Sequence, residues 1–506
     1  MAFEVLKGEE MEWPAYLDEY EKLVIRMNTP RVVIDNAVCP TATLVQVDSA
    51  RKQGFLLEAV QVLADLNVSI KKAYISSDGR WFMDVFHVTD QFGGKLTDES
   101  VISYIEQVFS SSKFPKKSDY FEIYLLAALE NRKTPAKISF LEASLITFLV
   151  KMQSLETGSG IKSSGSGGGD GLTVLELTGA DRPGLLSEVF AVLADLQCGV
   201  VEAKVWTHNG RIACLLFVRD ETSGEPIENA LRIHGVESRL GHVLKGDHGV
   251  RGAKTAVSSL AVAHTDRRLH QMMFADRDYE HPPPSPAAAP PSVSVQNWIE
   301  RGYSIVTVQC QDRPKLLFDI VCTLTDMEYV VFHGTIDTDG DQAHQEFYIR
   351  HKDGSPISSE AERQRVIQCL QAAIERRASE GLRVELCAVD RPGLLSDITR
   401  TFRENGLFVT RAEVSTKGQM ASNFFYVIDA AGKPADHDAI EAVRQRIGTG
   451  TACLKVEEEQ WLQVCRKAAR AREEAQTQTG GGLGLFYLGN LVMRNLYNLG
   501  LIRSCS

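Results

Sequence analysis

The sequence predicts an α+β fold built from tandem βαββαβ units with antiparallel sheets, and two observations support this prediction. The first is a segment that occurs four times, in which a short alternating strand leads through a turn into a helix. The second is a hairpin signal that follows each copy, with two alternating runs joined by a tight polar turn. Such ferredoxin-like units leave one sheet face and the sheet edges uncovered. We therefore expect the units to pair through sheet edges or faces.

Each copy begins with a short alternating run rich in β-branched residues, which is typical of a strand. Three copies are clear and contain Asp-Arg-Pro in the turn, at 172–186, 303–317 and 382–395. A fourth, degenerate copy at 42–58 lacks both the aspartate and the proline. Proline is tolerated at the first helical position because its missing N–H would have no partner there. We therefore expect a helix directly after each turn.

The elements after the turn also recur in one order. In the second copy, apolar residues from Leu185 to Leu196 fall on one helical face. Two strands around Asn209-Gly210 follow, and Asn-Gly is a strong hairpin signal. A second helix, clearest at 359–377, closes each unit, and a last strand can follow. The expected hairpin strands are 70–76 with 81–88, 199–207 with 211–219, 330–338 with 343–351, and 410–416 with 420–428.

The spacing of the copies is uneven. Asp181 and Asp312 are 131 residues apart, whereas Asp312 and Asp390 are only 78 apart. Only one strand, 382–388, fits between the second helix of the third copy and the turn of the fourth. We therefore expect the third copy to lack its closing strand, although a tight fusion of the last two copies would give the same spacing.

Composition marks the connecting segments. The stretch 158–171 is rich in glycine and serine and is expected to be a flexible linker, whereas 281–291 is rich in proline and alanine and stiffer. The stretch 120–152 fits no repeat and is either a helical hairpin on the first copy or a poorly packed insertion. The tail 481–506 is either a disordered or surface-packed end, or a docking segment. The expected segments are an N-terminal segment (1–30), a degenerate first repeat (31–114), an atypical insertion with the Gly/Ser linker (115–170), the second repeat (171–250), a linker with the Pro-rich stretch (251–300), the third repeat (301–380), the fourth repeat (381–458), and a C-terminal helix and tail (459–506).

The overall composition excludes several classes of protein. The 506 residues are 44% hydrophobic and 24% charged, which suits several globular cores. With 55 basic and 66 acidic residues, the net charge of −11 opposes bulk attraction to nucleic acid or anionic membranes. Ten cysteines without a CxxC pair indicate reduced interior thiols. Without a membrane-spanning run or a targeting peptide, we expect a cytosolic or nuclear protein.

The strand–Asp181-Arg-Pro-Gly-Leu-Leu186–helix pattern resembles the ACT domain, a small regulatory module that senses amino acids. Four such units resemble the plant ACT-domain-repeat proteins and, more distantly, the carboxy-terminal region of the bacterial nitrogen-sensing uridylyltransferase. The resemblance covers most of 20–460 but does not extend to 120–152. It implies an amino-acid-binding regulator connected with nitrogen metabolism, with glutamine as the first candidate ligand. Further supporting segments are 81–85, 263–266, 273–278, 326–330 and 500–503.

The Asp-Arg-Pro-Gly turn is chemically suited to an α-amino acid. A helix N-terminus offers unpaired N–H groups to a carboxylate, glycine permits close approach, and the aspartate can meet an ammonium group. Alternatively, the aspartate merely caps the helix. In the third copy Lys315 replaces the glycine and adds bulk and charge, so we favour the second and fourth copies. The candidate ligand-binding residues are Asp181, Arg182, Gly184, Leu185, Asp390, Arg391, Gly393 and Leu394, with Asp312 of the third copy as a further candidate.

No pattern in the sequence indicates catalysis. A nucleotidyltransferase needs closely spaced aspartates after a Gly-Ser turn, but the Gly/Ser stretch holds only Asp170. His437-Asp438 is the only His-Asp dipeptide, and His264, Asp266 and His270 have no further ligand cluster beside them. We therefore expect no catalytic residue, no metal site and no cofactor.

Two functions remain open from the sequence. The first is a sensor that binds a free amino acid at the junction of paired units and relays this to an unidentified regulatory protein. The second is an interaction scaffold whose repeats no longer bind a ligand. The units could pair within one chain or across a homo-oligomer.

Overall fold

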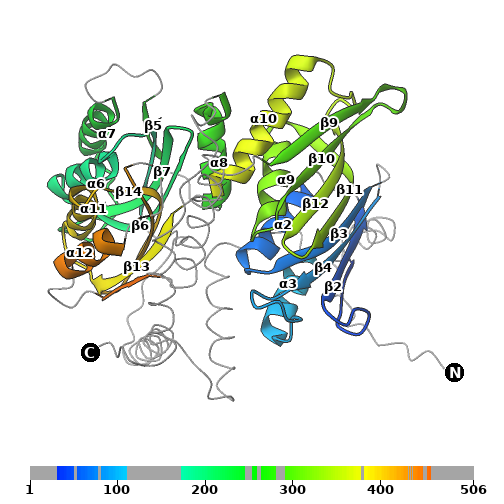
Figure 1. Cartoon of the computed structure of the whole chain (residues 1–506), viewed down its shortest axis with the longest axis horizontal. Coiled ribbons are helices and arrows are strands. Elements are labelled where there is room, and N and C mark those ends of the chain that lie inside the picture. The colour runs from blue at the N-terminus through cyan, green and yellow to red at the C-terminus, as the bar shows by residue number, and fades with distance from the viewer. Residues whose placement is uncertain are drawn as a thin grey trace, which may run out of the picture.

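The computed structural model describes residues 31–50, 54–77, 81–110, 172–245, 253–258, 264–280, 291–377, 381–430, 432, 435, 437–447 and 453–456. Within these ranges the strands form two eight-stranded antiparallel sheets with helices packed on them, so the predicted α+β class is confirmed (Figure 1). The turn segment 51–53, the stretch 120–152, the Gly/Ser linker, most of the Pro/Ala-rich linker and the tail 481–506 lie outside the described residues.

The first sheet combines the first and third repeats, and we call this unit the first module. Its strand order is β1-β2-β4-β3-β11-β12-β10-β9. The first repeat comprises β1 (Arg31–Asp35), β2 (Thr43–Ala50), α2 (Phe55–Asp65), β3 (Ser69–Ser77), β4 (Trp81–Thr89) and α3 (Glu99–Ser110). The third comprises β9 (Ser292–Trp298), the short η3 (Ile299–Arg301), β10 (Tyr303–Gln311), α9 (Leu316–Asp326), β11 (Tyr329–Asp339), β12 (Gln342–His351) and α10 (Glu360–Arg377).

The second sheet combines the second and fourth repeats in the second module. Its strand order is β16-β13-β15-β14-β6-β7-β5-β8. The second repeat comprises β5 (Thr173–Ala180), α6 (Leu185–Asp195), β6 (Cys198–His208), β7 (Arg211–Asp220), α7 (Ala230–Lys245) and β8 (Lys254–Ser258). The fourth comprises β13 (Leu382–Val389), α11 (Leu394–Glu404), β14 (Leu407–Lys417), β15 (Met420–Asp429), α12 (His437–Ile447) and β16 (Cys453–Val456).

The repeats pair within one chain, and the partners are not consecutive. In the first module β3 pairs with β11, and in the second module β6 pairs with β14, both antiparallel. Each of these pairings covers an edge strand that would otherwise expose unpaired backbone groups. The sheet edges therefore join the repeats, which is one of the two modes of pairing expected from the sequence.

The position of the outermost strand differs between repeats. In the second and fourth repeats it comes last, because β8 pairs with β5 and β16 with β13. In the first and third repeats it comes first, because β1 pairs with β2 and β9 with β10. The third repeat therefore lacks a closing strand, as its short spacing to the fourth predicts. The outermost strand can therefore come from the segment before or after the rest of the repeat, because pairing requires only that it lie beside the edge strand.

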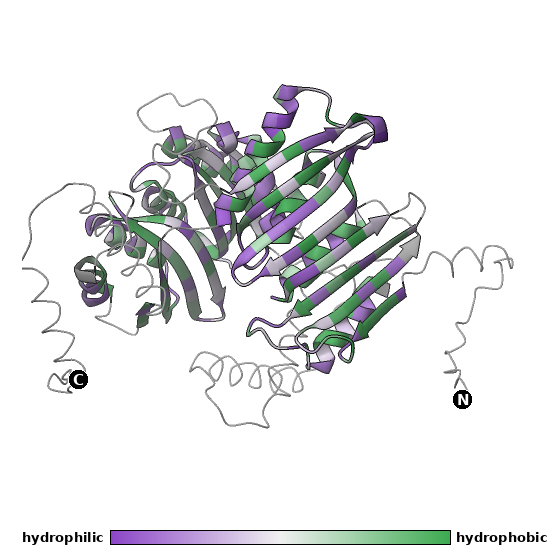
Figure 2. Cartoon of the chain, turned by 45° about the vertical axis from the view of Figure 1, so that its right-hand side comes forward, coloured by the Kyte–Doolittle hydropathy of each residue, from purple (hydrophilic) through white to green (hydrophobic). Residues whose placement is uncertain are grey.

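Each module has one hydrophobic core that spans both of its repeats. In the first module, the core joins Leu63 and Phe86 of the first repeat to Phe347 of the third. In the second, it joins Leu177 to Phe402 and Phe425, whose rings pack edge to face with centroids 5.2 Å apart. Figure 2 shows hydrophobic and hydrophilic residues alternating along the strands of the first sheet, as expected where helices cover only one face. Each pair of repeats is thus one packed unit.

Helix α8 (Thr265–Ala275) and the short η2 (Asp278–Glu280) lie between the modules (Figure 1). The open face of the second sheet contributes Trp206 and Leu215 to a cluster with Met272 and Met273 of α8. On its other side α8 contacts α9, while α10 contacts both β6 and η2. The first module therefore covers the open face of the second sheet through α8 and its own helices.

Buried ion pairs complete this interface. Asp278 is fully buried and accepts two hydrogen bonds from Arg376 of α10, at 2.6 and 2.7 Å. Its Oδ2 also lies 2.8 Å from Nδ1 of His208 in β6. Removing one member of such a group would leave a buried charge without a partner, which is strongly destabilising. The interface is therefore specified by charge as well as by apolar packing.

His208 makes the docking of the modules dependent on pH. Its Nε2 lies 3.3 Å from Glu375, so both ring nitrogens face carboxylates. Burial favours the neutral ring, but the bonds to Asp278 and Glu375 outweigh it and raise the pKa of His208. A raised pKa in the folded state stabilises the fold fully below about pH 6.5, and this contribution is lost as the pH rises through the folded-state pKa.

We therefore expect the free energy of unfolding to fall as the pH rises above about 6.5, and His208→Gln to remove this part of the fall. Urea unfolding between pH 6 and 9 measures it. Parallel pH profiles for the two proteins would contradict the assignment.

Candidate functional site

The three Asp-Arg-Pro turns adopt the same backbone geometry. Each aspartate N–H donates to a carbonyl of the neighbouring hairpin at 2.7–2.8 Å, from Asp181, Asp312 and Asp390. The residue directly before each helix has a positive φ, which favours glycine. Its values are 81° at Gly184, 66° at Lys315, 77° at Gly393, and 85° at Gly54 of the degenerate copy. The turn therefore places the start of each helix above a hairpin.

In the second repeat the candidate residues are already engaged. Arg182 forms a two-bond ion pair with Glu188, at 2.5 and 2.8 Å, and Leu185 lies in the core. Gly184 lies against Arg403 of α11, because a Cβ placed on this glycine would be 2.5 Å from Cδ of Arg403. The side chain of Arg403 thus fills the space above this turn.

Burial raises the pKa of Asp181 to about 7. The carboxyl group of Asp181, in the same turn as Gly184, therefore ionises only at a higher pH than an exposed aspartate does.

The fourth repeat has a more open turn. A Cβ on Gly393 would meet no atom of the described residues within 4 Å, and Leu394 below it is buried in the core. Arg391 is exposed and pairs with Asp397 at 2.6 Å. Burial raises the pKa of Asp390 above its ordinary value. This turn therefore offers backbone access that the turn of the second repeat does not.

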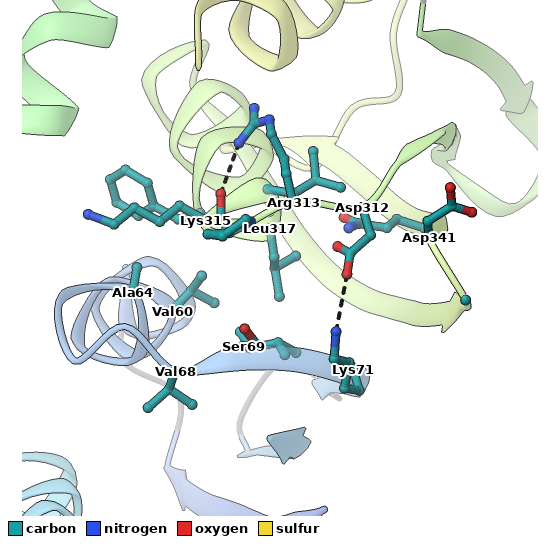
Figure 3. Close-up of a pocket in the computed structure, with 16 residues that line it drawn as sticks. Val60, Ala64, Val68, Ser69, Lys71, Asp312, Arg313, Lys315, Leu317 and Asp341 are labelled. Atoms are coloured by element: carbon teal, nitrogen blue, oxygen red, sulfur yellow. Dashed lines mark hydrogen bonds and ion pairs between the residues drawn. The ribbon is translucent and has the colours of Figure 1, made fainter. Parts of the chain in front are cut away.

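In the third repeat, the turn forms a cavity of about 310 Å³ at the seam with the first repeat (Figure 3). Asp312 lies on one side, and its carboxylate is 3.4 Å from the ammonium group of Lys71 on the other. Lys71 is the extra residue of a β-bulge in β3, between Ile70 and Lys72. A bulge redirects a side chain out of the regular alternation. The cavity thus has an opposite charge on each repeat.

Gln345 of β12 contributes a buried polar group to the cavity wall. Its side chain is 2% exposed, and Oε1 has no hydrogen-bond partner among the described residues. A buried acceptor without a donor is costly, so a ligand N–H at this place would be favoured.

Gln345 is the fourth residue of β12, the second strand of its hairpin. The same position is occupied by Asp84 in β4, Cys214 in β7 and Asn423 in β15, and all three residues are buried. Burial raises the pKa of Asp84 to about 7, and both amide atoms of Asn423 lack a partner among the described residues. None of these positions was predicted from the sequence as part of a site. Their signal is a polar residue on the inward-facing side of an alternating strand.

The side chain of Lys315 departs from the sequence expectation. We expected its charge to lie where a ligand would approach. Instead, Nζ pairs with Asp266 of α8 at 3.0 Å, and Figure 3 shows the side chain pointing away from Asp312 and Lys71. The positive charge is therefore directed at α8, although the aliphatic part still lines the cavity.

The cavity has the groups that an α-amino acid requires. Leu317 and Phe318 line it from the first turn of α9, where backbone N–H groups have no partner within the helix. These groups and Lys71 suit a carboxylate, while Asp312 suits an ammonium group. A volume near 300 Å³ is at the small end of ligand pockets.

Within the described ranges, no group of three His, Cys, Asp or Glu side chains is arranged to hold a metal ion. None of the helices described has the length and apolar character needed to cross a membrane.

Comparison with known families gives four matches along the chain. Residues 38–116 match the ACR family N-terminal ACT domain, and 292–387 match the ACR9-like, ACT-like domain. Residues 172–241 and 382–445 each match the ACT domain.

Whole-chain comparison finds relatives that match over nearly their full length, and a more distant one that matches over part of its length. The chain is 55% identical over 498 residues to the ACT domain-containing protein ACR8 of Arabidopsis thaliana, covering 98% of this chain and 100% of that protein. It is 50% identical over 495 residues to ACR4 of the same plant, covering 97% and 98%. It is also 25% identical over 205 residues to the bifunctional uridylyltransferase/uridylyl-removing enzyme of Rhodospirillum rubrum, covering 40% of this chain and 20% of that enzyme.

The raised pKa of Asp181 predicts a measurable effect on stability. An acid with a raised folded-state pKa destabilises the fold progressively as the pH rises from about 4 to about 7. Asp181→Asn should therefore gain stability over the wild type across this range, by about 1 kcal/mol or more, and the gain should be constant above it. Urea unfolding at pH 4.5, 6 and 7.5 measures the gain. Asp195→Asn, at an exposed ion pair with Arg239, is the control, and an equal profile for both variants would refute the prediction.

Proposed function

Since the chain belongs to the ACR family of ACT-domain regulatory proteins, we propose that it is a sensor that binds a free α-amino acid at the seam between the first and third repeats. One observation carries this proposal: a cavity between the two repeats has Asp312 on one wall, Lys71 on the other, and the buried Oε1 of Gln345, which has no partner among the described residues. A zwitterion needs opposite charges at close distance, and this seam supplies them.

A bound amino acid would replace the weak ion pair between Lys71 and Asp312. The ion pair between Lys71 and Asp312 is 3.4 Å long and partly exposed, so it contributes little stability by itself. A ligand carboxylate would pair with the ammonium group of Lys71 and accept hydrogen bonds from the N–H groups of the first turn of α9. The ligand ammonium group would pair with the carboxylate of Asp312. The Oε1 of Gln345 would accept from a further N–H donor. A side-chain amide provides such a donor, which is compatible with glutamine, the first candidate that the resemblance to nitrogen-sensing proteins gives.

A second site is proposed at the fourth repeat. Asp390, Arg391, Gly393 and Leu394 form an open turn there, and the unpartnered amide of Asn423 is buried in the same repeat. At the second repeat, the turn with Asp181, Arg182, Gly184 and Leu185 is filled by Arg403, so a ligand would bind there only after this side chain moves.

The proposal assigns no catalytic role and no cofactor to the chain. The sensor would act in the cytosol or nucleus, in the control of nitrogen metabolism, by presenting a changed surface to an unidentified protein partner rather than by contacting nucleic acid. The alternative is a scaffold without a ligand. The observation that favours this alternative is that a continuous hydrophobic core already joins the two repeats of each module.

Ligand binding should be visible as thermal stabilisation. A ligand at one hundred times its dissociation constant stabilises the folded state by about 2.7 kcal/mol. We expect this from glutamine in a screen of the twenty amino acids, and we expect Lys71→Met to abolish it. Lys72→Met is the matched control, because the neighbouring Lys72 pairs with Asp337 outside the cavity. A screen in which no amino acid raises the melting temperature would favour the scaffold.

We expect the tenth residue of the helix that faces each turn to decide whether the space over that turn can hold a ligand. Ala64 and Arg403 are both the tenth residue of an eleven-residue helix that faces the turn of the partner repeat. Ala64 lines the cavity, whereas Arg403 fills the space over Gly184. We expect Ala64→Arg to abolish binding at Asp312, and Arg403→Ala to add one binding site per chain.

Isothermal titration calorimetry measures both changes. Arg400→Ala, an exposed change on the same helix as Arg403, should leave the stoichiometry at the wild-type value. If Arg403→Ala also leaves the stoichiometry unchanged, the space over Gly184 is not a closed binding site.

A further inference from the structure

Lys315 occupies a backbone conformation that suits glycine. Its φ is 66°, and the three equivalent positions in the other repeats are glycines. A left-handed conformation at a residue with a side chain stores strain, which persists only where surrounding contacts determine it. Here the contact is the 3.0 Å ion pair between Lys315 and Asp266 of α8. The strained residue therefore connects the cavity turn to the helix between the modules.

Asp266 joins this turn to the second module. Its carboxylate also pairs with Lys204 of β6 at 2.6 Å and with Arg377 of α10 at 3.1 Å. Burial alone would raise the pKa of Asp266, but the cations Lys204, Arg377 and Lys315 outweigh it and hold the pKa well below its usual range. One ionised carboxylate is thus shared by the cavity turn, the helix layer of the first module and the second sheet.

The other basic residue of the turn enters the same network. Arg313 pairs with the fully buried Asp319 of α9 at 2.7 Å. Asp319 also binds Arg377 at 2.9 Å and lies 2.8 Å from Nε2 of His270 in α8. Arg377 in turn lies over the ring of Trp206, 5.0 Å from its centroid, on the open face of the second sheet.

Among the described residues, the equivalent turns of the second module make no ion pair with the interface between the modules. Arg182 and Arg391 also pair with the fourth residue of their own helix, Glu188 and Asp397. Their glycines, Gly184 and Gly393, have no side chain that could reach a neighbouring element. The turn of the third repeat is therefore the only one of the described turns that has an ion pair with the interface on each side of its proline. These ion pairs are made by Arg313 and Lys315.

We propose that Lys315 is a positioning residue that couples occupancy of the cavity to docking of the second module. Asp312, Arg313 and Lys315 lie within four residues, so a ligand held by Asp312 restrains the other two. A ligand that holds the turn in this conformation also holds the partners of Asp266 and Asp319 in place. By linkage, ligand binding and docking strengthen each other by the same factor. This inference rests on the proposed function.

Hydrogen exchange of the full chain, followed by mass spectrometry, tests the coupling. L-glutamine, or whichever of the twenty amino acids stabilises the wild type, should slow exchange in α8 and β6 by about fivefold or more. Lys315→Gly suits the backbone, so the fold should persist, and it should still bind the amino acid by calorimetry. The slowing at α8 and β6 should be lost in this variant and restored by Lys315→Arg. Exchange in α12, which is remote from the interface, is the internal control.

The outcomes separate the two proposals. If the wild type binds none of the amino acids, the proposed function fails and the coupling fails with it. If it binds one but exchange in α8 and β6 does not slow, only the coupling is refuted. If Lys315→Gly abolishes binding as well, Lys315 is a binding residue, and its positioning role is refuted.

Discussion

The need to cover open sheet edges determines most of this structure. A four-stranded unit of this kind has an unpaired edge strand, and joining β3 to β11 and β6 to β14 removes that edge inside each module. The joining also brings the start of α9 against α2 and β3, and the start of α6 against α11. Side chains from two repeats therefore meet at a seam, where Lys71 and Asp312 face each other. The candidate site is a consequence of how the edges are covered.

Local features of the fold were predictable from the sequence, whereas the pairing of the repeats was not. Strand, turn, helix and hairpin are encoded within a few residues, as Asn209-Gly210 shows, and the structure places these elements as expected. The choice of partner depends on contacts more than one hundred residues apart, which no local pattern records. The same holds at the site. Asp312 stands out in its motif, but Lys71, Arg403 and Gln345 matter only through what lies opposite them in the folded chain.

The two modules share one architecture but differ in what covers their sheets. Helix α8 does not cover the open face of the first sheet, because it contacts the helices on the opposite side. Helix α8 and the helices of the first module cover the open face of the second sheet. This contact is rich in buried charge, including Asp278 and Asp319, and buried charges tolerate little displacement because each must keep its partners. An interface of this kind suits a protein in which an event at one seam must reach a distant surface.

The alternation of repeats between the sheets also affects how the chain folds. The polypeptide passes from one sheet to the other three times, because the first and third repeats share one sheet and the second and fourth share the other. During synthesis, the first repeat must wait for the third before its edge is covered, and the second must wait for the fourth. A nascent chain therefore carries two uncovered strands at once, β3 and β6, which are liable to pair wrongly. Chaperone binding during translation would protect them, and truncation before β14 would leave β6 permanently without its partner.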